Sequence, residues 1–169
     1  VKVDETLTDS TFGVSQKALK LERRVEMYQW VEEVKTSTKK KRGKRIKKKK
    51  YKYKKAWKSS YENSSNFKDS KARRKKVNPK MKYAKQEFAA KNATLGAFKL
   101  SPSAIGKLSG TKKMSLDAVP SKIKDNKNFK LDSGSLYYGK NPSDPSVGDL
   151  RITYYMAKPD VISIVARQN

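Results

Sequence analysis

Residues 18–33 constrain the fold more than any other part of the sequence, because apolar and polar side chains alternate along them. A period of two is typical of a β-strand with one face on a core and the other on solvent or a second layer. The apolar register contains Leu19, Leu21, Val25, Met27 and Val31, and the polar register contains Lys20, Glu22, Arg24, Glu26, Tyr28, Trp30 and Glu32. We therefore expect a core strand of a β-rich domain here.

The residues that follow predict a long basic hairpin over 18–60. A basic connection at 36–45 contains one glycine, which suits a turn, and a second strand-like run follows at 46–60. A strand with aromatic residues inside and lysines outside is soluble and is protected against edge-to-edge pairing. In the second run one face carries Tyr51, Tyr53 and Trp57, and the other carries Lys50, Lys52, Ala56, Lys54 and Lys58.

The whole chain, residues 1–169, predicts a single domain in which a loop and mixed segment at 61–128 separates the hairpin from C-terminal strands at 129–168. Residues 61–80 are typical of a polar loop that ends at an Asn-Pro turn. Residues 81–101 combine features of helix and strand, so we expect mixed structure there. A Ser-Pro start followed by spaced apolar residues predicts a short helix at 101–108.

The last part of the chain predicts more strands. We expect a hairpin at 129–140 that turns at Asp132-Ser133-Gly134, a strand at 150–157 with one apolar face, and a strand at 161–168 that is apolar on both faces. The predicted fold class is therefore α+β and β-rich, with a mainly antiparallel sheet, a long hairpin and one or two short helices.

The composition excludes most catalytic and metal chemistry. The sequence contains no His and no Cys, so disulfides, thiolate nucleophiles, most catalytic triads and most zinc sites are ruled out. The acidic residues are scattered, and a hydrolase with carboxylate chemistry would need two of them to converge in a cleft. We expect no enzyme, no catalytic residue, no metal or cofactor, and no small-molecule substrate.

The formal net charge of +26, from 42 Lys and Arg against 16 Asp and Glu, favours binding to a polyanion. Lysines interleaved with aromatic residues at 39–58 would suit a single-stranded nucleic acid, so a basic RNA-binding or ribosome-associated protein is the alternative function. The competing interpretation is a solvated hairpin face in a lysine-biased composition, with the aromatic residues packed inside. The sequence leaves both interpretations open.

The sequence contains no apolar run long enough to span a membrane, and it begins with Val. We expect it to be an excised or processed piece of a longer protein. Two Asn-x-Ser/Thr sequons occur, at Asn63 and Asn92, and they would be used only in a eukaryotic lumen.

Several segments carry a resemblance to a known family. Three are distinctive: VEMYQW at 25–30, VGDLR at 147–151 and IVARQ at 164–168. The others are Phe12-Gly13-Val14, Tyr53 and Trp57 followed by Ser59, Asn66-Phe67, Asn78-Pro79, Phe88-Ala89, the run LGAFKLS at 95–101, Tyr137-Tyr138, Asn141-Pro142 and Pro145-Ser146. In this order along the chain, they resemble the LUMA (transmembrane protein 43) family.

The resemblance implies a multi-pass membrane protein of the endoplasmic reticulum and inner nuclear membrane, or a bacterial relative. It implies that this chain is the large domain outside the bilayer, in the lumen or perinuclear space, or in the periplasm or at the cell surface of a bacterium. The family is associated with nuclear-envelope organisation, self-association and partners such as emerin and lamins, and it supplies no catalytic residues. The hairpin connection is mixed or acidic in animal members, whereas it is strongly basic here.

We therefore expect a scaffold or interaction module that contacts other membrane or envelope proteins, a second copy of itself, or anionic lipid headgroups, with nucleic acid less favoured. Lysines near an anionic membrane each add about 1 kcal/mol to binding. The candidate contact residues are Tyr28, Trp30, Lys47, Lys48, Lys49, Lys50, Lys52, Lys54 and Lys58.

Overall fold

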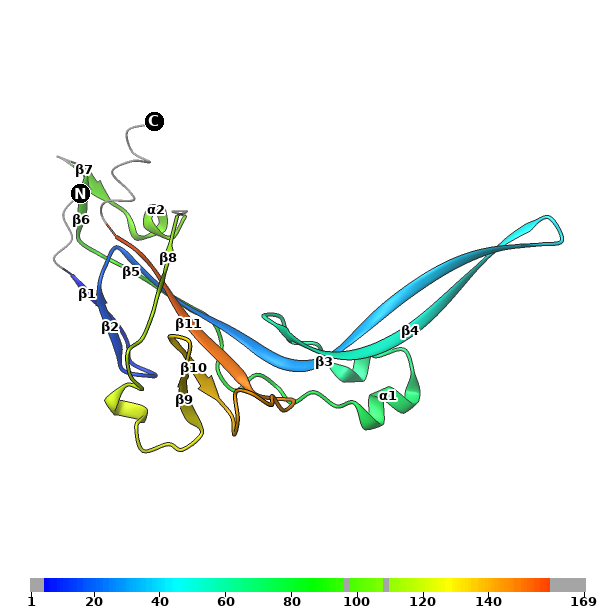
Figure 1. Cartoon of the computed structure of the whole chain (residues 1–169). Coiled ribbons are helices and arrows are strands. Elements are labelled where there is room, and N and C mark those ends of the chain that lie inside the picture. The colour runs from blue at the N-terminus through cyan, green and yellow to red at the C-terminus, as the bar shows by residue number, and fades with distance from the viewer. Residues whose placement is uncertain (1–4, 96–97, 108–109, 159–169) are drawn as a thin grey trace.

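A seven-stranded antiparallel sheet forms the centre of the structure, a computed structural model that describes residues 5–95, 98–107 and 110–158. Its strands are β3 (Lys20–Lys41), β4 (Lys44–Lys58), β5 (Gln86–Ala89), β8 (Lys112–Met114), β9 (Phe129–Asp132), β10 (Ser135–Tyr138) and β11 (Leu150–Ala157). Five of them follow the order β4-β3-β11-β10-β9, while β5 pairs with β3 and β8 pairs with β11 (Figure 1).

Smaller elements surround this sheet. Two hairpins are formed by β1 (Thr6–Asp9) with β2 (Val14–Lys17) and by β6 (Ala93–Leu95) with β7 (Phe98–Leu100). The helical elements are α1 (Ser70–Lys75), α2 (Pro102–Gly106) and the 3-10 turns η1 (Ser64–Asn66) and η2 (Ser121–Ile123). The predicted β-rich, mainly antiparallel structure with a long hairpin is confirmed, whereas the assignment to the α+β class stays a prediction.

The strand predicted from the alternation at 18–33 is confirmed as β3, which is longer than expected. β3 pairs with β5 at 20–23, with β11 at 20–27 and with β4 at 27–41. Leu21, Val25 and Met27 on its apolar register are at most 3% exposed. The register of the sequence pattern therefore fixed which face of β3 meets the core.

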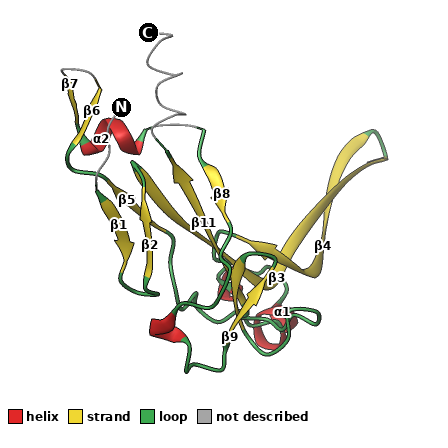
Figure 2. Ribbon diagram, turned by 60° about the vertical axis from the view of Figure 1, so that its left-hand side comes forward, coloured by secondary structure: helices red, strands yellow, loops and turns green. Residues whose placement is uncertain are grey.

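The core lies between this face of the sheet and the β1–β2 hairpin, which lies against β5 (Figure 2). Phe12, in the turn of that hairpin, is fully buried and packs edge-on against Tyr83 and Phe129, with ring centroids 4.9 and 5.6 Å apart. Leu136 of β10 and Ile152 of β11 lie directly opposite each other and are also fully buried. The hairpin is thus the second layer that the alternation in β3 required.

A buried ion pair fastens the β1–β2 hairpin to the sheet. Nη1 of Arg23 donates to both carboxylate oxygens of Asp9, at 2.8 and 2.7 Å, and the Tyr154 hydroxyl donates to Asp9 Oδ2 at 2.6 Å. Arg23 stands on the apolar register of β3 and is 5% exposed, and its Nε donates to the Ala84 carbonyl. Burial raises the pKa of Tyr154 above its ordinary value, and the bond to Asp9 raises it further.

Both predicted hairpin turns are present, but the basic connection predicted at 36–45 is mostly strand, because residues 36–41 belong to β3 and residues 44–45 to β4. Arg42 and Gly43 have φ of 52° and 76°, as a two-residue hairpin turn requires, and they join β3 to β4. Ser133 and Gly134 form the corresponding two-residue turn between β9 and β10, with φ of 50° and 79°. The predicted strand at 150–157 is β11, and the predicted strand at 161–168 lies outside the described residues.

The middle of the chain differs from expectation in its detail. The predicted loop at 61–80 also contains η1 and α1, because Asn63 and Asp69 cap them by accepting hydrogen bonds from backbone N–H groups. In the mixed segment at 81–101 the structure shows β5, β6 and β7. The helix predicted at 101–108 is confirmed as α2, with the Ser101 side chain accepting from the Ala104 N–H.

We expect Asp9→Ala to lower the free energy of unfolding by about 3–5 kcal/mol, because it leaves the Arg23 guanidinium buried without its counter-charge. Chemical denaturation followed by tryptophan fluorescence measures this loss. Lys54→Ala, which removes an exposed ion pair with Glu33, is the matched control and should leave the midpoint nearly unchanged. Equal effects of the two substitutions would contradict the assigned role of the buried pair.

Candidate interaction surface

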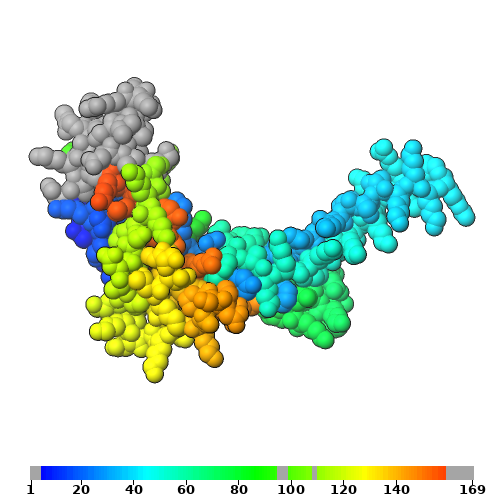
Figure 3. Space-filling model, viewed as in Figure 1, coloured from blue at the N-terminus to red at the C-terminus, as the bar shows by residue number. Residues whose placement is uncertain are grey.

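The outer half of the β3–β4 hairpin projects from the body as a two-stranded ribbon (Figures 1 and 3). We refer to residues 34–51 as the ribbon. Every residue from 34 to 50 is exposed. Eleven of the sixteen residues at 35–50 are Lys or Arg, and none is Asp or Glu. The ribbon is therefore an extended, purely cationic projection.

Like charges face each other across the ribbon. Lys35 lies opposite Lys50, Lys40 opposite Arg45, and Lys41 opposite Lys44. Directly opposed like charges destabilise an antiparallel pair, and an isolated two-stranded hairpin is at best marginally stable in water. Neutralisation of these side chains by negative charge would remove this repulsion.

Aromatic side chains gather at the base of the ribbon. Trp57 packs against Tyr28, with ring centroids 5.3 Å apart, and against Tyr137 at 5.9 Å. The Arg151 guanidinium lies over the Trp57 ring, 4.0 Å from its centroid. The predicted inward aromatic face is thus half-buried at Tyr51, Tyr53 and Trp57. Rings held against other side chains make a poor stacking platform for nucleic-acid bases.

The segment 61–80 closes over this aromatic face. Phe67, which is buried, lies 5.2 Å from Tyr53 between ring centroids. The Tyr53 hydroxyl donates to Glu32 Oε2 at 2.7 Å, and the same carboxylate oxygen accepts from the Lys68 N–H at 2.7 Å. Burial raises the pKa of Tyr53, and the bond to Glu32 adds to this rise. Lys76 completes the cover, with its ammonium 4.4 Å from the Trp30 ring centroid.

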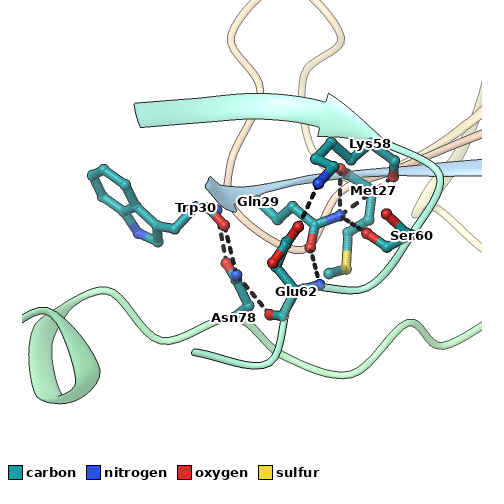
Figure 4. Close-up of polar contacts among 7 residues, drawn as sticks. All are labelled: Met27, Gln29, Trp30, Lys58, Ser60, Glu62 and Asn78. Carbon is teal, nitrogen blue, oxygen red and sulfur yellow. Dashed lines mark hydrogen bonds and ion pairs between the residues drawn. The ribbon is translucent and has the colours of Figure 1, made fainter. Parts of the chain in front are cut away.

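Two amide side chains, Gln29 and Asn78, lock this segment to β3, and we call them the amide clasp (Figure 4). Gln29 is fully buried; its Nε2 donates to the carbonyls of Met27, Lys58 and Ser60, and its Oε1 accepts from the Glu62 N–H at 2.8 Å. The side chain thus holds the chain at the point where it leaves β4.

Asn78 completes the clasp by acting as a short substitute for a strand. On the edge of β3 that faces β11, Tyr28 exchanges hydrogen bonds with Asp149 and Gly148. At Trp30, the next residue with the same orientation, Asn78 Oδ1 accepts from the N–H at 2.7 Å and Nδ2 donates to the carbonyl at 2.8 Å. The backbone pairing of β3 therefore continues for one more step beyond the end of β11.

The structure divides the predicted contact residues into two groups. Lys47, Lys48, Lys49 and Lys50 lie in the ribbon and Lys52 lies next to it, and all five are exposed. Each of the other four has contacts in the body.

In this second group, Lys54 pairs with Glu33 at 2.7 Å and, by donating a hydrogen bond to it, lowers the pKa of the Glu33 carboxyl. Lys58 pairs with Glu62, and Tyr28 and Trp30 are half-buried at the base. The predicted set did not include the other ribbon cations, which are Lys35, Lys39, Lys40 and Lys41 of β3, Arg42 of the turn, and Lys44 and Arg45 of β4. The basic run at 39–45 was a sufficient signal for most of them.

A groove of about 750 Å³ lies near the stretch of β3 that neither β4 nor β5 covers. Its lining mixes acidic side chains, Glu22 and Glu26, with the basic side chains of Arg24, Lys85 and Arg151. Neither positive nor negative charge dominates the lining, so the lining does not indicate which class of ligand the groove would bind.

Within residues 5–95, 98–107 and 110–158 the structure contains no group of three or more potential acidic metal ligands. Within the same residues, no helix has the length and apolar character to cross a bilayer.

Comparison with known proteins identifies relatives along the whole chain. The family model described as Transmembrane protein 43 matches residues 27–169, which include both members of the amide clasp. The chain is 34% identical to Transmembrane protein 43 of Mus musculus and of Homo sapiens, over 99% of its own length in both cases, and 27% identical to the Transmembrane protein 43 homolog of Drosophila melanogaster. It spans 43% of the length of the mouse and human proteins and 44% of the fly protein. No solved structure matches.

We expect Asn78→Ala to increase hydrogen exchange of the Trp30 amide roughly 5- to 150-fold, because a buried donor that loses its acceptor is destabilised by about 1–3 kcal/mol. Exchange measured by NMR tests this directly. The Tyr28 amide, which donates to the Asp149 carbonyl, is the internal control and should stay protected. Equal acceleration at both amides would show general unfolding and would contradict the local role of Asn78.

Proposed function

Because the chain belongs to the transmembrane protein 43 family, we propose that it is the part of a multi-pass membrane protein that lies outside the bilayer. The relatives are more than twice as long as this chain, which leaves room for membrane anchors elsewhere in the full-length protein. In a eukaryote the domain faces the lumen of the endoplasmic reticulum or the perinuclear space. In a bacterium it faces the periplasm or the cell surface.

The domain works as a scaffold and interaction module in membrane organisation, as in the nuclear envelope or endoplasmic reticulum, and not as an enzyme. Family membership supports the non-catalytic part of this role, because the family is not a known enzyme family. Its partners are other membrane or envelope proteins, a second copy of the chain, and anionic lipid headgroups. The whole chain acts as one domain in this proposal, with the ribbon as its most extended contact surface.

The ribbon carries the mechanism, and its exposure together with its purely cationic charge is the observation on which the proposal depends. Seven residue steps separate residue 34 from residue 41, so the ribbon extends roughly 23 Å from its base. The Debye length at physiological ionic strength is about 8 Å. Charges on the body are screened over that distance, so only the ribbon side chains bring their charge within reach of an opposing anionic surface.

A lipid surface suits the ribbon better than a nucleic acid does. Anionic headgroups need only exposed cations, which the ribbon offers on both faces, and each lysine near such a surface contributes about 1 kcal/mol. Single-stranded nucleic acid would also need exposed aromatic rings. Below the ribbon, the Tyr53 ring is held against Phe67 and the Trp57 ring against Tyr28 and Tyr137. The Trp30 ring lies between them along the hairpin, with the ammonium groups of Lys55 and Lys76 over it.

We expect the domain to sediment with vesicles that contain phosphatidylserine and to bind pure phosphatidylcholine vesicles far more weakly, with an affinity that falls as salt rises. Changing four ribbon lysines to Gln should reduce the affinity roughly a hundred- to thousandfold. The four are Lys47, Lys48, Lys49 and Lys50.

The matched control removes the same charge from the body. It changes four exposed lysines outside the ribbon, Lys80, Lys124, Lys127 and Lys140, to Gln. This variant should bind within a few-fold of the unmodified chain. An equal loss of vesicle affinity in both variants would contradict the ribbon as the contact surface. Salt-resistant binding to single-stranded RNA that is lost in Trp57→Ala would move the function to nucleic-acid binding.

A further inference from the structure

Three asparagines in the chain are followed two residues later by Ser or Thr. They are Asn63 in Asn-Ser-Ser, Asn92 in Asn-Ala-Thr and Asn141 in Asn-Pro-Ser. The first two match the acceptor triplet for N-linked glycosylation, whereas the third is excluded because Pro occupies the middle position. The structure shows whether each asparagine side chain is exposed and which hydrogen bonds its amide group forms.

Asn63 is exposed in the connection between β4 and η1. Its Oδ1 accepts from the Ser65 N–H at 3.1 Å and from the Ser65 hydroxyl at 2.7 Å, which makes it the cap of η1. Both bonds use the carbonyl oxygen of the amide. A substituent on Nδ2 therefore leaves the cap intact, and the exposed position gives a bulky group access to solvent.

Asn92 lies in the exposed turn between β5 and β6. The carboxylate of Glu5 holds this turn through the backbone, because it accepts from the N–H groups of Lys91 and Asn92 at 3.0–3.2 Å. The side chain of Asn92 takes no part in these bonds, and Thr94 is also exposed. The turn is therefore held in place by contacts that a modified Asn92 side chain would not disturb.

Two other asparagines, Asn78 and Asn141, serve as comparisons for the exposure and the Nδ2 bonding of Asn63 and Asn92. Asn78 is 4% exposed, and its Nδ2 donates to the carbonyls of Trp30 and Glu62 as part of the amide clasp. Asn141, by contrast, resembles Asn63: it is exposed, and its Oδ1 accepts from the Ser143 N–H at 3.0 Å. Asn141 differs from Asn63 in having Pro142 next to it, which makes it a natural negative control.

We propose that Asn63 and Asn92 are N-glycosylation sites, an inference that rests on the lumenal placement of the domain in a eukaryotic protein. The donor is a lipid-linked oligosaccharide diphosphate. A bond forms between Nδ2 and the anomeric carbon of the first sugar, the bond from that carbon to the diphosphate oxygen breaks, Nδ2 loses one proton, and the lipid diphosphate leaves. Both asparagines lie in connections outside the ribbon, one between β4 and η1 and the other between β5 and β6, so the ribbon remains free of glycan for contact with its anionic partner.

The test is the mobility of the full-length protein, expressed in animal cells, on denaturing gels before and after digestion with peptide N-glycosidase. Digestion should increase the mobility of the unmodified protein by the equivalent of two glycans. Asn63→Gln and Asn92→Gln should each remove one glycan, and the double substitution should abolish the shift. Pro142→Ala, which turns the Asn141 triplet into an acceptor, should add a third glycan.

The outcomes separate this inference from the proposed function. An unmodified protein that digestion does not shift, together with a shifted Pro142→Ala variant, would overturn the two sites while leaving the lumenal placement in force. No shift in any variant, including Pro142→Ala, would overturn both the sites and the placement. A single substitution that keeps the full shift would exclude its own residue.

Discussion

The backbone hydrogen-bonding capacity of β3 is the constraint on which the rest of the structure depends. Over 20–27 the strand is paired with β11 on one edge, and with β5 over 20–23 on the other. On the edge that faces β11, the loop before β11 forms the backbone hydrogen bonds of Tyr28, and Asn78 of the amide clasp forms those of Trp30. Beyond this point β3 has β4 as its partner, and the outer part of the pair projects into solvent as the ribbon. The same strand is thus core at one end and a solvent-exposed projection at the other.

Several of the scarce acidic side chains hold distant parts of the chain together. Asp9 neutralises the buried Arg23, Glu32 joins Tyr53 to the backbone of Lys68, and Glu5 holds the turn before β6. Asp149 accepts from the Tyr137 hydroxyl and the Ser146 N–H, which orders the loop before β11. With these carboxylates committed to the body, the excess of cations is concentrated on the surface and above all in the ribbon.

The sequence predicted what depends on local periodicity and turn chemistry, and it missed what depends on distant partners. Alternation located β3, and Gly43 and Gly134 marked two hairpin turns. Arg23 and Gln29, however, interrupt the apolar register, and they are buried because Asp9, Ser60 and Glu62 meet them from other parts of the chain. No local pattern reveals such partners. The predicted contact residues stay a prediction, and those of them that lie in the ribbon all come from β4, although β3 and the turn carry cations there as well.

The continuity of β3 also has a mechanical consequence. A force that separates the two strands at the ribbon tip breaks their hydrogen bonds one pair after another, which is the weak direction of a hairpin. A force that draws β3 along its own axis loads all of its bonds to β11 at once, which is the strong direction. Separating the two ribbon strands therefore takes less force than drawing β3 out of the sheet, so a force of the first kind opens the ribbon while the buried ion pair and the core remain intact.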